Sequence, residues 1–139
     1  MIRVSNLTKT FNHGKIRAVD NISFELEKGE IGCLIGTSGC GKTTTLKMIN
    51  RLIEPSNGRI WINNLESHGV DPVNWRRKIG YVIQKAGLLP HLTVAQNISL
   101  LSNILKRDTS FIEDRVRELL QTINLPYDSF SKRYPIELS

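Results

Sequence analysis

The sequence has little of what marks several common classes of protein. Its 139 residues include only two cysteines, Cys33 and Cys40, which are too few for a disulfide framework. No apolar run approaches the roughly 18 residues that a membrane-spanning helix needs, and the N-terminus alternates polar and apolar residues, unlike a secretory signal. We therefore expect reduced thiols and a cytoplasmic location.

The excess of basic residues is not arranged as in a nucleic-acid-binding protein. The net charge is +6, but aromatic residues make up only 6% of the chain. The longest basic run is Arg76–Lys78, and acidic residues are interspersed elsewhere, without the alternation of aromatic and basic residues that binds single strands. Because only the charge favours a role on nucleic acid, we expect no nucleic-acid partner.

The apolar pattern predicts an α/β fold. The segments that read as strands are Ile2–Leu7, Ala18–Leu26, Ile31–Ile35, Arg59–Asn63 and Ile79–Ile83. The predicted helices are Lys42–Leu52, one starting at Asp71-Pro72, and two that open at the capping boxes Thr93–Gln96 and Ser110–Glu113. The last helix should bury one face made of Ile112, Val116, Leu119, Leu120 and Ile123.

Residues Gly36–Thr43, with the sequence GTSGCGKT, match the phosphate-binding pattern G-x-x-x-x-G-K-[ST]. Glycines let successive backbone N–H groups approach phosphate oxygens, and the N-terminus of the next helix attracts the same anion. Lys42 can reach the β- and γ-phosphates, and the Thr43 hydroxyl can bind the bridging Mg²⁺. The alternative is a chance match, but an apolar segment before the loop and a helical pattern after it favour a nucleotide site.

Three longer stretches make the chain resemble the ATPase subunits of ABC transporters. The stretch IGTSGCGKTTTLKMINRLIEPSNGRI resembles their Walker A region, GYVIQKAGLLPHLTVAQNI their Q-loop and its flank, and YPIELS the residues that lead into their signature loop. The resemblance covers nearly the whole chain. Within the family, KMINRLIEP and Gln84–Asn97 look most like importers of quaternary amines such as glycine betaine, choline or carnitine.

The resemblance implies roles for particular residues. Phe11 would stack on adenine, and the alternative is that it packs in the core. Gln84 would bind Mg²⁺ and sense the γ-phosphate, and the alternative is a plain surface role. Lys42 and Gln84 would serve catalysis, and Thr43 and Gln84 the metal. The expected ATP-binding set is Phe11, Gly36, Thr37, Ser38, Gly39, Cys40, Gly41, Lys42, Thr43 and Thr44.

The resemblance also implies partners. The loop Lys85–Leu92 would face a transmembrane permease subunit, because its Leu88, Leu89 and Pro90 are apolar residues in a loop. A second ATPase subunit would complete the nucleotide site, and a solute-binding protein would act indirectly. Since no second His or carboxylate stands at ligand spacing from His91, we expect that histidine at a surface or interface.

The expected fold is therefore the N-terminal part of a P-loop ABC ATPase. We expect an antiparallel β subdomain and partial P-loop core over about residues 1–92, and the start of a helical subdomain over about residues 93–139. The family's Walker B aspartate, catalytic glutamate and switch histidine have no match in this sequence. We expect either the front half of a MgATP-hydrolysing import subunit at the inner face of the membrane or a non-catalytic ATP-binding fragment, with no turnover from these 139 residues alone.

Overall fold

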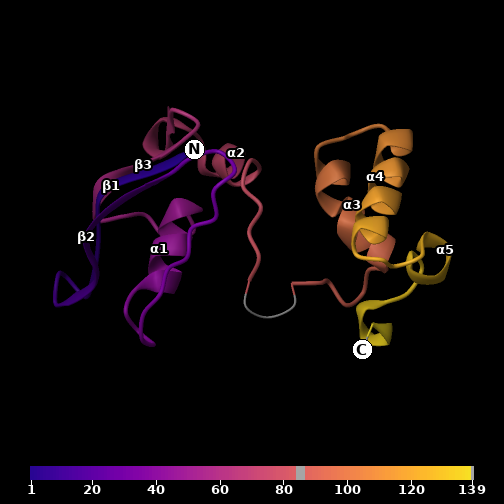
Figure 1. The fold of residues 1–139 in the computed structure, drawn as a ribbon, viewed down its shortest axis with the longest axis horizontal. Helices are drawn as coiled ribbons and strands as arrows, with labels where there is room; N and C mark the ends of the chain where they lie inside the picture. The colour runs from indigo at the N-terminus through magenta and orange to yellow at the C-terminus, as the bar shows by residue number, and fades with distance from the viewer. Residues whose placement is uncertain (84–86, 139) are drawn as a thin grey trace. The chain divides into compact units, whose positions relative to one another are not determined.

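The chain forms two compact units, Met1–Tyr81 and Val82–Ser139. The computed structural model describes residues 1–83 and 87–138. Figure 1 shows the helices and strands of the two units. The subdomain boundary expected near residue 92 stays a prediction. No helix in the described ranges is long and apolar enough to cross a bilayer.

An antiparallel sheet is the framework of the first unit. Strands β1 (Ile2–Phe11), β2 (Ile16–Leu26), β3 (Asn57–Ile62) and β4 (Leu65–Glu66) pair in the order β2-β1-β3-β4 (Figure 1). The long β1–β2 hairpin turns at residues 12–15, as the polar sequence there predicts. The predicted antiparallel β part is thus confirmed, with strands longer than the sequence pattern indicated.

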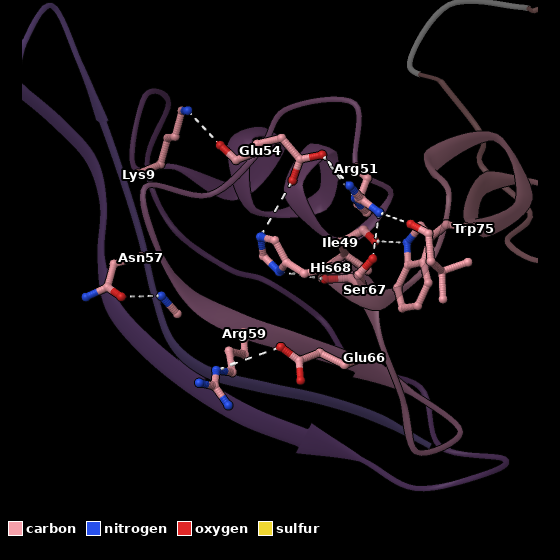
Figure 2. Close-up of polar contacts among 12 residues, drawn as sticks. Lys9, Ile49, Arg51, Glu54, Asn57, Arg59, Glu66, Ser67, His68 and Trp75 are labelled. Atoms are coloured by element: carbon pink, nitrogen blue, oxygen red, sulfur yellow. Dashed lines mark hydrogen bonds and ion pairs between the residues drawn. The ribbon is translucent and has the colours of Figure 1, made fainter.

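One face of this sheet packs on helix α1 (Lys42–Ile49) and on the segment that carries η1 (Ser67–Gly69) and α2 (Pro72–Arg76). The buried apolar side chains of this core are Val4, Leu7, Val19, Met48, Ile60 and Trp75. The indole N–H of Trp75 donates to the Ile49 carbonyl at 2.9 Å, so this buried polar atom is satisfied (Figure 2). Asp71 caps α2 through the backbone N–H groups of Val73 and Asn74, as predicted.

Helix α1 ends three residues before the predicted Leu52. Arg51 adopts a left-handed backbone with φ of 50°, which a helix does not contain. Its guanidinium donates to the Ser67 and Val70 carbonyls at 2.6 Å each and to Glu54 at 2.9 Å (Figure 2). These bonds tie the end of α1 to the η1 turn, and the gain offsets the backbone strain.

Two predicted strands, Ile31–Ile35 and Ile79–Ile83, are not strands in the structure. The side chains of Ile31, Ile35 and Val82 are 92%, 93% and 95% exposed, so the predicted burial of the first segment is wrong as well. A β-strand exists only when a neighbour pairs with it. No strand of the described residues lies in register with either segment, and periodicity in a sequence does not reveal that.

The second unit is helical. It contains α3 (Val94–Ile104), α4 (Thr109–Thr122), α5 (Tyr127–Phe130) and η2 (Pro135–Glu137), packed around Val94, Val116 and Leu120 (Figure 1). The capping box at Thr93 is confirmed. The box predicted at Ser110 is wrong, because α4 begins earlier and Asp108 is its N-cap. Ile123, expected on the buried face, follows the end of the helix and is 61% exposed.

Candidate nucleotide site

The glycine loop lies between the end of the hairpin and α1 in the first unit. Helix α1 begins at Lys42, and its N-cap is Gly41, which makes no side-chain capping bond. The first N–H groups of a helix have no intrahelical partner and carry a partial positive charge. The sequence thus places an uncapped helix N-terminus directly behind the loop, which suits an anion such as phosphate.

Glycine is required at position 41 because the loop passes close to β2. Gly41 has φ of +96°, and a Cβ there would lie 2.4 Å from the Ala18 carbonyl oxygen and 3.1 Å from Val19 Cγ2. A side chain would therefore clash with the backbone of β2, and the left-handed conformation would be strained in addition. At Gly36 a Cβ would lie 2.6 Å from Cys40 Sγ, so the loop is also closely folded on itself.

Lys42 places its charge inside the loop. The Nζ atom donates to the Gly36 and Thr37 carbonyls at 2.7 Å each and lies 3.5 Å from Cys40 Sγ. Loop residues 36–41, the first turn of α1 and the Lys42 ammonium are thus brought together, as the motif requires. An ammonium beside a helix N-terminus can bind phosphate by charge and by its rotatable donors, which here donate to the loop carbonyls.

Thr43 and Thr44 belong to the first turn of α1, next to Lys42. Thr43 is exposed, so its hydroxyl can reach a ligand at the loop. A hydroxyl oxygen beside phosphate oxygens is the kind of hard donor that Mg²⁺ prefers. Thr45 instead turns inward and donates its hydroxyl to the Gly41 carbonyl at 3.0 Å, which fixes the junction of loop and helix.

A cavity of about 490 Å³ opens beside the loop. It is lined by Gly39, Cys40, Gly41, Lys42 and Thr45 on the loop side, by Leu34 and Ile35, and by Arg17, Ala18, Val19, Asp20 and Ile22 of β2. Sequence reasoning missed Arg17 and Asp20, because a charged pair at i and i+3 on a strand carries no motif. The structure shows them as the charged groups on the β2 wall of this cavity.

Phe11 is the last residue of β1 and pairs with Ile16 across the hairpin. The side chain is 38% exposed, and Lys9 Nζ lies 5.2 Å from the centre of the ring. Phe11 therefore lies outside the buried core, in contrast to the packing alternative. It ends a strand that runs four residues beyond the predicted Ile2–Leu7, and its role toward adenine stays a prediction.

The expected Q-loop residue, Gln84, lies outside the described residues, as does the start of the loop Lys85–Leu92. Further along that loop, Leu88 and Leu89 are 45% and 37% exposed. Asn97 of α3 fixes this part, because its side chain accepts from the Leu89 N–H at 2.7 Å and donates to the Leu89 and Leu92 carbonyls at 3.1 and 3.0 Å. Sequence reasoning did not identify Asn97 as the anchor of these apolar residues.

Comparison with known proteins gives a consistent result. Residues 19–139 match the ABC transporter family. The chain is 49% identical over 139 residues to the carnitine transport ATP-binding protein OpuCA of Listeria monocytogenes, 51% identical to the choline transport ATP-binding protein OpuBA of Bacillus subtilis, and 46% identical to the osmoprotectant import ATP-binding protein OsmV of Salmonella typhimurium. All of the chain is matched, but it spans only 34%, 36% and 37% of those proteins.

Solved structures show the same likeness. A dimeric ATP-binding cassette in a post-hydrolysis state, bound to ADP and Pi, aligns with a TM-score of 0.83 at 32% identity. The alignment covers 100% of this chain and 63% of that one. An ATP-binding subunit of an ABC transporter aligns with a TM-score of 0.83 at 27% identity, with 99% and 55% of the two chains covered.

Proposed function

Since this chain belongs to the ABC transporter family, with the fold of part of an ABC ATPase, we propose that it is the nucleotide-binding region of an importer that takes up a quaternary-amine osmoprotectant. Relatives named for carnitine, choline and osmoprotectant transport support the solute class. The chain spans about a third of their length, so the activity, solute and partners of the whole transporter belong to the proposal.

The observation that carries the proposal is the phosphate loop. The Lys42 ammonium lies against the Gly36 and Thr37 carbonyls of the loop, and Lys42 is also the first residue of α1, whose N-terminus has no side-chain cap. We assign the β- and γ-phosphates of ATP to Lys42 and the first-turn N–H groups, and Mg²⁺ to the Thr43 hydroxyl. Bound Mg²⁺ would neutralise charge on the phosphates, and Phe11 would hold the adenine ring.

The proposed partners follow from the family. A second ATPase subunit would pair with this one, as the cassettes in dimeric solved structures do. A transmembrane permease would contact the exposed Leu88 and Leu89, which Asn97 holds to α3. This arrangement would place the protein at the inner face of the membrane, with a solute-binding protein on the far side.

The second candidate is nucleotide binding without turnover by these 139 residues. Asp20 is the only acidic residue on the wall of the cavity within the described part of the chain, and it is paired with Arg17. Hydrolysis needs a group that orients the attacking water beside the γ-phosphate. Both oxygens of the Asp20 carboxylate already accept hydrogen bonds from Arg17 Nη1, at 3.1 and 3.0 Å, so this carboxylate is engaged with its neighbour on β2.

Lys42→Ala tests the nucleotide site. Removal of the charge should weaken MgATP binding by about ten- to a hundredfold, because hydrogen bonds to a charged group contribute about 1.5–3 kcal/mol each. Equilibrium titration with a fluorescent ATP analogue measures this. Lys28→Ala is the matched control, since Lys28 lies exposed in a turn and should bind as the wild type does. Equal affinity for Lys42→Ala and wild type would show that the loop is not the site.

A further inference from the structure

One short stretch of β2 connects the two ends of the candidate nucleotide site. Ile16 pairs with Phe11 across the hairpin, and Arg17 pairs with Thr10. Ala18 follows Ile16 by two residues, and its carbonyl oxygen would lie only 2.4 Å from a Cβ built on Gly41. The strand therefore runs from the Phe11 ring to the phosphate loop, and Arg17 lies between these two points.

Arg17 offers a charged group there that the fold does not need. Its side chain is 62% exposed, and both of its described hydrogen bonds run from Nη1 to the Asp20 carboxylate, at 3.1 and 3.0 Å. An exposed ion pair of this kind contributes little to stability. A guanidinium has five N–H donors in a rigid fork, so Nε and Nη2 remain as donors that Arg17 can present to a ligand.

ATP has the matching order of chemical groups. Its ribose and α-phosphate lie between the base and the β- and γ-phosphates. A nucleotide with its base at Phe11 and its terminal phosphates at Lys42 would therefore bring this middle part past Arg17, which lines the same cavity as Lys42. Guanidinium groups bind phosphate oxygens through charge-assisted, frequently bidentate hydrogen bonds.

We propose that Arg17 is a further nucleotide-binding residue, which contacts the α-phosphate. This inference rests on the proposed function and adds a second cation to it, on the β2 wall of the cavity that Lys42 also lines. Asp20 holds the guanidinium at that wall through Nη1. Because ATP and ADP share the α-phosphate, Arg17 contributes equally to the binding of both.

The test uses Arg17→Ala and Arg17→Lys in the full 139-residue chain. Arg17→Ala should weaken ATP and ADP binding by the same factor, about tenfold, and Arg17→Lys should restore part of the loss by keeping the charge. Arg115→Ala is the matched control, because Arg115 forms an exposed i,i+3 ion pair with Glu118 in the other unit. Its affinity should equal that of the wild type. Circular dichroism melting checks that the variants fold alike.

Three results would overturn the inference while the proposed function stands. The first is wild-type binding that depends on Lys42 but is unchanged in Arg17→Ala. The second is a loss for ATP without a loss for ADP, which would place Arg17 at the γ-phosphate. The third is a wild-type preference for ATP over 2′-deoxy-ATP that disappears in Arg17→Ala, which would assign Arg17 to the ribose. Failure of the wild type to bind ATP would instead contradict the proposed function itself.

Discussion

At the scale of single residues, the candidate site depends on how closely the loop approaches β2. Gly41→Ala should lower the free energy of unfolding by at least about 1–2 kcal/mol, since φ of +96° is strained for any residue with a Cβ and the Ala18 carbonyl lies in the way. Nucleotide affinity should fall as well, because the loop must move. Chemical denaturation and ATP titration measure the two effects.

Gly69→Ala is the control for that substitution. No atom lies within 4 Å of a Cβ built at Gly69. The stability and the nucleotide affinity of Gly69→Ala should therefore stay close to those of the wild type. If Gly41→Ala behaved like Gly69→Ala in both measurements, the close packing of the loop on β2 would be refuted.

At the scale of elements, alanine substitution at the two predicted capping boxes should affect stability differently. In α3 the Gln96 N–H donates to the Thr93 hydroxyl at 3.3 Å and the Thr93 N–H donates to the Gln96 side chain at 2.8 Å. Thr93→Ala should therefore cost about 1 kcal/mol. Ser110 lies inside the first turn of α4, so Ser110→Ala should leave stability equal or slightly raised. Thermal unfolding measures the stability of both variants. An equal loss of stability in the two would contradict the starts of α3 and α4 given above.

The elements also show what the sequence could and could not predict. Local signals were sufficient for β1, β2, β3 and the starts of α1, α2 and α3, because caps, turns and alternation act between near neighbours in the chain. Ile31–Ile35 and Ile79–Ile83 carry the same apolar signal, but a strand needs a partner that no local pattern supplies. The left-handed Arg51 was missed for a related reason, since the carbonyls that hold it come from residues 67 and 70.

In the candidate site, too, local signals were predictable from the sequence and long-range contacts were not. The sequence predicts the phosphate loop because the chemistry of phosphate binding requires a fixed spacing of glycines and one lysine. Arg17 was not, because it reaches the cavity only through the pairing of β1 with β2 and the approach of Gly41 to Ala18. Contacts between segments distant in sequence thus decide which charged residues line the candidate cavity.

At the scale of the whole molecule, we propose that the unit Met1–Tyr81 binds the nucleotide and that the helical unit contacts the partners. Two-dimensional ¹H–¹⁵N NMR of the labelled chain during a MgATP titration tests this assignment residue by residue. The amides that shift most should be those of residues 36–44, with smaller shifts at Phe11 and Arg17, and Lys42→Ala should greatly reduce them all. Shifts confined to residues 94–137, or the same shifts in wild type and Lys42→Ala, would contradict it.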